Sequence, residues 1–599
     1  MRLTRGRARR LVPLGAGLLL VAQLFSWGPR AAAQAAGDPV DARGYATGQP
    51  AHVQALEAGG TRIADAEVAW SAASVDADAD GLKGAKLNEV NRILQPDKAG
   101  KLTYARGSGF EVGLATTPAD ENQVIVSAKA EAVAPPKSSD IQEIGVEGLD
   151  PIAYASLLRG TALANLNDSG LVPDVCVLGD DLSRGTGFAT DVELVDTAGD
   201  TSQPNLDGAL VALDDQNPDR SVSQSTSRMK LVPTGKPNNF GLMAEVRQTI
   251  APVTILQGDD DDPTTPLRQI TIEILGEWVL RVVANGSTGG ASVFYGPGTV
   301  NPQVPILRII DSEDAVSDIL SFQDLFGDTG FDAINIPGVV SIAIGEDPRA
   351  IAAPGQNPDP ASKPKIAADG TSVSAAVDVV RVQLLSQPDP QAADIRVGHM
   401  EVSSEVPEGG INCPLPVIKS ATETEISVGD QTTISIEVDN VYDCDLTKVI
   451  LVDTISQRTG SPNFTIEDTG GDAKPTSDDD LTKVLPPGDA KQTVLEWDLG
   501  TIPKGKSKSV NFTIEATDGG LLRDIAEASG TFANCSGQDA TGLAIAGLEL
   551  TGLSVPVDVN ITTPQTGASA GKTAATGGVL AIGATALGLF LRRRSMRGI

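Results

Sequence analysis

A regular alternation of apolar and polar residues between positions 408 and 560 restricts the fold of this chain more than any other feature. Ile434, Ile436 and Val438 are separated by single polar residues, which is the two-residue period of a strand with one buried face. Further strand-like runs follow about every 10–15 residues, with turn residues between them. This spacing predicts an antiparallel β-sandwich of the immunoglobulin-like (Ig-like) type over residues 408–560.

The preceding stretch, residues 36–407, shows many short β-type runs separated by Gly, Pro, Asp and Asn, for example 123–130, 267–284 and 372–386. Such runs are typical of an antiparallel, sheet-rich architecture. No clear boundary divides this stretch. We therefore expect a large β-rich N-terminal unit, and a mainly β fold class for the whole chain.

Two segments of that unit are predicted to be short packing helices. Residues 151–165 begin with Pro151 and continue with an Ala- and Leu-rich body. Residues 312–326 begin with Ser312 as a helix cap, followed by two acidic residues in the first turn. Both patterns are typical of helix starts.

The N-terminus has the pattern of a secretory signal. Five arginines occur in the first ten residues, residues 11–27 are mostly apolar, and small residues follow at 31–36. A basic start, a short apolar run and a small-residue exit are the parts of a cleavable signal peptide. We expect residues 1–35 to be removed on export.

The C-terminus has a membrane segment followed by a basic tail. Residues 577–591 are apolar, and Arg592, Arg593, Arg594 and Arg597 lie in the tail 592–599. Basic residues stay on the cytoplasmic side of a membrane, so the long chain before the segment should lie outside. The expected fold thus ends in a C-terminal transmembrane or sorting helix.

The linker at 561–576 carries the pentapeptide Thr563, Pro564, Gln565, Thr566 and Gly567. Pentapeptide, apolar segment and basic tail together resemble the LPXTG sorting signal of Gram-positive wall proteins. The resemblance implies that a sortase cleaves between Thr566 and Gly567 and joins the Thr566 carboxyl group to peptidoglycan. The chain departs from the pattern at its first position, which is Thr563 instead of Leu; a plain membrane anchor is the alternative.

Charge and histidine content exclude several classes of function. The formal net charge is −32. The charged residues of both terminal segments are all basic, so the part of the chain between them is more acidic still. Such a surface repels phosphate backbones, which argues against nucleic-acid binding. The two histidines, His52 and His399, lie near no GxSxG or HExxH motif, so we expect no enzyme. An envelope hydrolase that uses paired carboxylates is the catalytic alternative.

Four cysteines remain after export, and an oxidising location favours two disulfides. Strand alternation places Cys413, Cys444 and Cys535 near one pole of the expected sandwich. We favour Cys444–Cys535, a clamp between two loops, which leaves Cys176 for Cys413. The alternative is Cys413–Cys444 with Cys176–Cys535.

Region 38–412 contains six short motifs, at residues 176–180 (CVLGD), 183–187 (SRGTG), 276–281 (GEWVLR), 295–298 (YGPG), 344–349 (IGEDPR) and 398–401 (GHME). As a set they resemble the choice-of-anchor P surface proteins of high-GC Gram-positive bacteria. The resemblance implies an envelope-anchored protein and brings no known activity or ligand.

After residue 416 five strand motifs follow in order, at residues 417–420 (VIKS), 428–440 (VGDQTTISIEVDN), 446–455 (LTKVILVDTI), 495–505 (LEWDLGTIPKG) and 521–530 (LLRDIAEASG). This order resembles an Ig-like repeat domain common on bacterial surfaces. Domains of this kind on wall-anchored proteins sometimes join a first-strand Lys to a late-strand Asn or Asp through an isopeptide bond, helped by a buried acid. The resemblance implies Lys419, Asp524 and Asp453 for these three roles, with Asp524 standing at the Asn position. We favour the simpler interpretation, three surface charges.

A possible calcium loop lies at Asp76, Asp78 and Asp80, followed by Gly81. This spacing resembles the first half of an EF-hand loop, in which hard oxygen ligands and a turn glycine surround the ion. The twelfth position is Leu87 instead of Glu, so any Ca²⁺ site would be a weak surface loop. We otherwise expect no cofactor.

Together these features predict an exported, envelope-anchored, non-catalytic surface protein of a Gram-positive bacterium, with a structural or adhesive display role. Its expected location is the cell wall or cell surface. The expected partners are sortase and peptidoglycan, with the membrane before processing. A calcium-dependent binding module is the alternative, and the sequence names no extracellular ligand.

Overall fold

The computed structural model describes residues 42–563, except 58–60, 78–100, 115–123, 150–152, 197–208, 214–220, 256–268, 298–304, 312–316, 322–333, 337–339, 345–363, 385–392, 461–463, 473–474, 478–491 and 536–546. Every regular element in these residues is a β-strand. The expectation of a mainly β chain is therefore confirmed. Within the described ranges there is no helix of the length and hydropathy needed to cross a bilayer. The signal segment, the apolar segment 577–591 and the basic tail lie outside these ranges.

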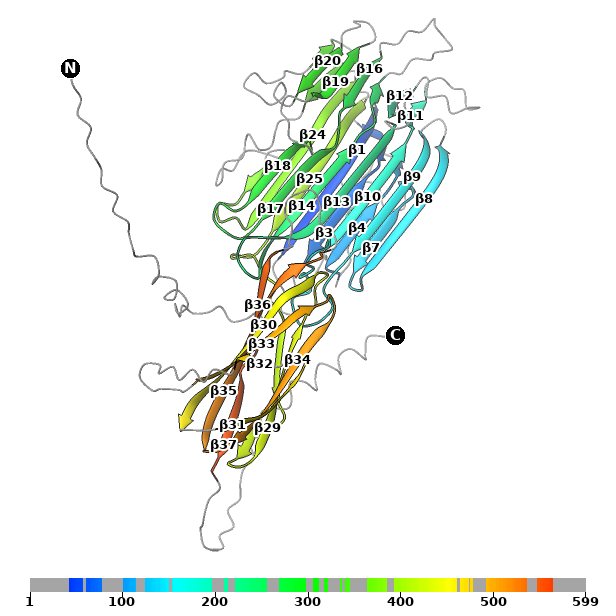
Figure 1. Ribbon diagram of the computed structural model, residues 1–599. Helices are drawn as coiled ribbons and strands as arrows, with labels where there is room; N and C mark the ends of the chain where they lie inside the picture. Colours follow the sequence, from blue (N-terminus) through cyan, green and yellow to red (C-terminus); the bar gives the residue numbers. More distant parts are fainter. Residues whose placement is uncertain are drawn as a thin grey trace, which may run out of the picture.

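Figure 1 shows two β units arranged end to end. The larger N-terminal unit, coloured blue to green, has two long sheets packed face to face. The smaller unit, coloured yellow to red, is a sandwich whose last strand lies at the end remote from the larger unit. The chain changes from one unit to the other between residues 412 and 417.

The first sheet of the N-terminal unit, sheet A, contains the first strand of the chain at its centre. In spatial order its main path is β21 (Ile334–Ile336), β22 (Val340–Ile344), β24 (Ser372–Leu384), β25 (Ala393–Glu405), β1 (Arg43–Glu57), β2 (Thr61–Val68), β5 (Phe110–Leu114) and β6 (Val124–Ser127). Beside this path, β3 (Ser71–Asp76) pairs with β1 and with β4 (Thr103–Gly107), β4 pairs with β7 (Ala130–Ala134), and β23 (Lys365–Ile366) pairs with β24.

The second sheet, sheet B, is antiparallel and packs on sheet A. Its main path is β18 (Ser292–Pro297), β17 (Trp278–Ala284), β14 (Asn239–Thr249), β13 (Val222–Pro233), β10 (Ser183–Thr190), β9 (Ala153–Ala164), β11 (Val192–Asp196), β12 (Ala209–Leu213), β15 (Val253–Ile255), β16 (Ile270–Ile274), β19 (Pro305–Asp311) and β20 (Ser317–Ser321). Beside it, β8 (Ser138–Leu149) pairs with β9, and β26 (Ile411–Asn412) pairs with β14.

The two sheets approach so closely at β4, β9 and β10 that backbone packs against backbone. A Cβ atom at Gly185 in β10 would overlap the carbonyl oxygens of Arg106 and Ala72 in sheet A. A Cβ atom at Gly107 in β4 would overlap the carbonyl oxygen of Thr186 in sheet B. Stacked sheets are usually about 10 Å apart because side chains fill the space between them. At Gly107 and Gly185 there is no side chain to fill this space, so the two backbones come into direct contact.

Serine side chains add direct hydrogen bonds between the sheets. The hydroxyl of Ser71 in β3 lies 2.7 Å from the hydroxyl of Ser225 and 2.8 Å from that of Ser227, both in β13. These hydroxyl groups are buried and satisfy one another, so their burial carries no unmet hydrogen bond. The N-terminal unit is therefore held by small polar and glycine contacts as well as by its apolar core.

The C-terminal unit is a sandwich of two sheets. Sheet C has the order β27 (Val417–Ala421), β29 (Gln431–Asp439), β34 (Ser507–Ala516) and β31 (Phe464–Gly471). Sheet D has the order β28 (Glu425–Ser427), β37 (Val557–Thr562), β35 (Gly520–Ala533), β30 (Asp445–Gly460), β33 (Gln492–Ile502) and β32 (Pro475–Ser477), with β36 (Glu549–Leu553) paired to β35. Ile434, Ile436 and Val438 point inward and are fully buried, as their alternation predicts.

The predicted helix over residues 151–165 is wrong. This segment is strand β9, which pairs with β8 on one side and with β10 and β11 on the other. From Leu158 to Ala164 burial alternates residue by residue, and Gly160 packs against carbonyl groups of sheet A. Strand pairing on both sides therefore outweighs the helix propensity of Ala and Leu.

The predicted helix over residues 312–326 is wrong where the structure describes it. Residues 317–321 form strand β20, which pairs antiparallel with β19. The remaining residues of that prediction lie outside the described ranges. Over residues 317–321, pairing with β19 therefore outweighs the local helix signal.

Several contacts fix the junction between the two units. Asn238, in the turn between β13 and β14, donates from Nδ2 to the carbonyl oxygen of Thr551 over 2.8 Å, and the Thr551 amide donates to its Oδ1 over 2.8 Å. The Cys413 amide donates to the carbonyl of the same residue, Asn238. Asn167 donates from Nδ2 to the carbonyl of Val441 in the sandwich. The units are thus joined by more than the connecting chain.

Candidate isopeptide site in the C-terminal sandwich

Three charged residues from three strands meet inside the sandwich. Lys419 lies on β27 in sheet C, and Asp453 and Asp524 lie on β30 and β35 in sheet D. Asp524 pairs with Ile455 and Asp453 pairs with Ala526, so the two aspartates lie diagonally on the same inward face. The side chain of Lys419 reaches this face from the opposite sheet.

The Lys419 ammonium group contacts both carboxyl groups at once. Nζ donates to Oδ1 of Asp453 and to Oδ1 of Asp524, and both contacts are very short. The three side chains are 0%, 0% and 1% exposed, in the same order. The favoured expectation of three surface charges is therefore wrong. The sequence alone does not show this burial. A charged residue within a strand pattern is normally assigned to the solvent face, so at an inward position it looks like a break in the apolar–polar alternation.

The surroundings of the three residues are apolar and aromatic. The Phe512 ring centroid lies 5.9 Å from Lys419 Nζ, and Phe512 stacks on Trp497 at 6.0 Å between ring centroids. Both aromatic side chains are buried. A charged ammonium group is costly to bury in such surroundings unless it is paired or loses its charge.

Burial raises the pKa of both carboxyl groups. For Asp524 the pKa rises well above its usual value, through burial and then through the neighbouring Asp453 carboxylate. For Asp453 burial also raises the pKa, while the Lys419 ammonium opposes the shift. Two carboxylates this close do not both ionise readily in a dry interior, so the pair tends to retain one proton. The site therefore offers one protonated acid, one carboxylate and one amine.

The structure contains two disulfides, Cys176–Cys413 and Cys444–Cys535, which is the pairing favoured above over its alternative. The first joins a loop of the N-terminal unit to the connection between the units. The second joins residues just before β30 and just after β35. Each would contribute roughly 2–4 kcal/mol to stability.

Of the three predicted calcium ligands, only Asp76 lies in the described residues. Asp76 contacts Arg43, with 3.5 Å between Oδ1 and Nε, while Asp78 and Asp80 lie outside the described ranges. In the part of the chain that the structure describes, no cluster of three or more His, Cys, Asp or Glu side chains is arranged to hold a metal ion.

Of the sorting pentapeptide, only Thr563 is described. It follows the end of β37 directly and is exposed. Pro564, Gln565, Thr566 and Gly567 lie outside the described ranges.

Both histidines are buried in strands of sheet A. His52 lies on β1 and His399 on β25. The Nδ1 atom of His399 lies 2.6 Å from Oδ1 of Asp378 on the neighbouring strand β24. Buried His–Asp pairs occur at catalytic sites, but they also stabilise sheets, and here both residues belong to regular paired strands.

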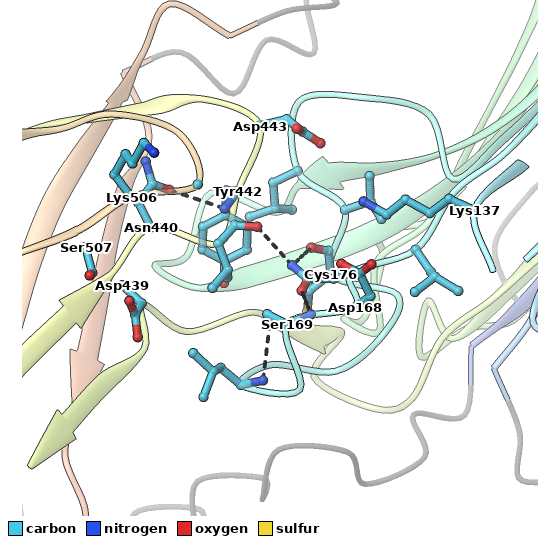
Figure 2. Close-up of a pocket in the computed structure, with 17 residues that line it drawn as sticks. Lys137, Asp168, Ser169, Cys176, Asp439, Asn440, Tyr442, Asp443, Lys506 and Ser507 are labelled. Carbon is cyan, nitrogen blue, oxygen red and sulfur yellow. Dashed lines mark hydrogen bonds between the residues drawn. The ribbon is translucent and has the colours of Figure 1, made fainter. Parts of the chain in front are cut away.

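A cavity of about 350 Å³ lies at the junction between the two units. Figure 2 shows Lys137, Asp168 and Ser169 of the N-terminal unit on one side, and Asn440, Tyr442 and Lys506 of the sandwich on the other. Asn440 donates to the carbonyl groups of Cys444 and Ile502, so it holds its own loop in place. These partners lie on elements far apart in sequence, which is why no local motif marks the cavity.

No family model matches the chain, and no curated protein matches it. Similar solved structures include AvmM, described as catalysing macrocyclization in alchivemycin A biosynthesis (10% identity, 26% of this chain and 91% of that chain, TM-score 0.16). Others are the full-length major pilin SpaD from Corynebacterium diphtheriae (14% identity, 37% and 59%, TM-score 0.18) and the N-terminal domain of the Streptococcus gordonii adhesin Sgo0707 (7% identity, 71% and 90%, TM-score 0.16). At these TM-scores the likenesses carry no inference about fold or function.

Proposed function

We propose that this chain is an exported, envelope-anchored, non-catalytic surface protein whose C-terminal sandwich is an internally crosslinked spacer for the N-terminal unit. The observation that carries the proposal is the Lys419 amine held between two buried carboxyl groups on strands of the opposite sheet. An amide bond between Lys419 and Asp524 would join the first strand of the sandwich to a late strand. Such a bond suits a domain that transmits tension.

The proposed reaction needs no cofactor. The Lys419 ammonium group gives a proton to the Asp453 carboxylate, and the neutral Nζ attacks Cγ of the protonated Asp524 carboxyl group. The C–O bond then breaks, and the hydroxyl group leaves as water with a second proton from Nζ, relayed by Asp453. The products are one amide, one water and a protonated Asp453. Proximity in a rigid core supplies much of the rate.

Two features of the architecture support a spacer role. The last strand, β37, ends at the pole of the sandwich remote from the N-terminal unit, as Figure 1 shows. The residues proposed as the sorting signal follow directly after it. At the other pole, the hydrogen bonds of Asn238 and Asn167 tie the sandwich to the N-terminal unit. A tether at one end and a fixed junction at the other would hold the N-terminal unit away from the envelope.

The crosslink has a direct mass signature. After reduction, we expect the intact folded protein to be one water lighter than its processed sequence, and a peptide pair joined through Lys419 and Asp524 to appear after digestion. Lys419→Met should have its full expected mass, and so should Asp453→Asn, which cannot accept the proton. Lys504→Met, at a surface position of the same unit, should still lose one water. A folded wild-type protein of full mass would overturn the proposal.

The anchoring half of the proposal has its own test. In the native host, we expect the protein to be released from the cell envelope by muramidase, and its C-terminal peptide to end at Thr566 with a peptidoglycan fragment attached. A Thr566→Ala variant should remain membrane-associated or be shed. Release by detergent alone, with the C-terminus intact to Ile599, would show a membrane anchor instead of sorting.

A further inference from the structure

The proposed amide and the disulfide of the sandwich close overlapping loops. Lys419 and Asp524 are separated by 105 residues, and Cys444 and Cys535 by 91 residues. In sequence order the four positions are 419, 444, 524 and 535, so the loops are interleaved and neither lies inside the other. This interleaving determines how the sandwich responds to tension between its two ends.

Tension enters and leaves the sandwich at opposite poles. It enters near Cys413, where the Cys176–Cys413 disulfide and the Asn238 contacts hold the junction. It leaves at Thr562, at the end of β37. A stretched chain follows the shortest covalent path between these points, and interleaved loops allow that path to use only one of the two crosslinks.

The first resistance to this tension is a parallel strand pair. Strand β28 pairs parallel with β37 through Glu425, Ile426 and Ser427. The Val428 amide extends the pairing by donating to the carbonyl of Thr562, and the Asn560 amide donates to that of Thr424. Pulling along β37 loads these hydrogen bonds together instead of one after another. Strand β37 is also paired antiparallel with β35 through residues 557–561, and once these pairings separate the covalent bonds limit the extension.

With the amide formed, the extensible path consists of residues 413–419 and 524–562, about 150 Å at full stretch. Without the amide, the disulfide takes over and the path becomes 413–444 and 535–562, about 200 Å. Without either crosslink the whole of 413–562 extends, to about 510 Å.

We propose that the Lys419–Asp524 amide and the Cys444–Cys535 disulfide are redundant tension limits, either of which prevents most of the extension of the sandwich. This inference rests on the proposed function, because it requires the amide. The amide survives reduction, and the disulfide covers molecules in which the amide has not formed. The extension of the sandwich under tension would therefore stay limited in reducing surroundings, and also before the amide has formed.

Single-molecule stretching of the full mature chain by its two ends tests this inference. The set comprises wild type, Lys419→Met, the double variant Cys444→Ser/Cys535→Ser, and the triple variant, all under oxidising conditions. The Cys176–Cys413 bond stays intact in each, so the N-terminal unit contributes equally. Asp453→Asn serves as a second amide-free variant in case Lys419→Met does not fold.

Relative to wild type, we expect no added length for the cysteine double variant, about 50 Å for either amide-free variant, and about 360 Å for the triple variant. Added length in the cysteine double variant, with the amide present by mass, would overturn the redundancy while leaving the proposed function intact. Release of about 360 Å by Lys419→Met alone would also overturn it. Wild-type and Lys419→Met proteins of equal length and full mass would overturn both proposals.

Discussion

Gly185→Val is expected to prevent the N-terminal unit from folding. The valine side chain would occupy the space of the Arg106 and Ala72 carbonyl oxygens in sheet A. Strands β10, β4 and β3, which carry these three residues, are each paired within their own sheet, so no one of them can move away locally without breaking its hydrogen bonds. We expect a loss above about 4 kcal/mol, because overpacking a core whose backbone cannot give way is among the few mechanisms with so large an effect.

Thermal unfolding by circular dichroism and limited proteolysis of the full chain would measure this effect. The matched control is Gly145→Val, on the exposed strand β8, where an added Cβ meets no atom within 4 Å. Because valine favours strands, the control should melt at or slightly above the wild-type temperature. A Gly185→Val protein that melts together with its control would show that the sheets can separate locally.

Lys419→Met is expected to destabilise the sandwich by two separate effects. The substitution leaves the Asp453 and Asp524 carboxyl groups buried with neither a cation nor an amide beside them. In molecules in which the amide has not formed, removing one partner of this buried ion pair costs about 3–5 kcal/mol. It also prevents the amide, which closes a loop of 105 residues. A crosslink over about 100 residues contributes up to about 4.7 kcal/mol, and less here because the Cys444–Cys535 disulfide already restricts much of the same loop.

Urea unfolding followed by hydrogen–deuterium exchange of the peptide that contains Trp497, a buried residue of the sandwich core, would separate the two effects. Asp453→Asn loses the amide but keeps Lys419 beside one carboxyl group, so its midpoint should lie between those of Lys419→Met and wild type. Lys504→Met should unfold as wild type. Equal midpoints for Lys419→Met and wild type would contradict both the buried ion pair and the crosslink.

The stability of the Lys419→Met protein should also fall as the pH rises. Burial raises the folded-state pKa of both aspartates, so the folded protein retains protons that the unfolded chain releases. Their contribution is complete below the unfolded aspartate pKa of about 3.9 and is lost as the pH rises through the raised folded values. The urea midpoint should therefore be lower at about pH 8 than at about pH 4, which is close to the unfolded aspartate pKa.

The strand pattern of the sandwich could be predicted because it is local. The alternation of Ile434, Ile436 and Val438 reports which face is buried, and these side chains are indeed buried. The favoured cysteine pairing is likewise present, since alternation places Cys444 and Cys535 in loops at one pole. These predictions need only the period of a strand and the position of its ends.

The sequence misleads where burial or pairing depends on distant residues. The Ala and Leu content around Gly160 predicts a helix, because it does not indicate that β8 and β10 pair with this segment on either side. Lys419 is expected to be a surface charge, because no residue near it in sequence indicates its contact with Asp453 and Asp524. The close approach of the two large sheets is not predicted either, since Gly107 and Gly185 look like ordinary turn glycines in the sequence.

The sequence by itself determined the β class of the chain, the strand pattern of the sandwich and the chemical groups available at each position. It also contains the terminal signals on which the anchoring proposal rests. Only the tertiary structure decided which groups meet: the amine of Lys419 with two carboxyl groups, and glycine backbone with the facing sheet. The physical reason is that strand periodicity is a property of neighbouring residues. Burial of charge and inter-sheet distance depend instead on partners more than 30 residues away, such as Asp453, 34 positions from Lys419.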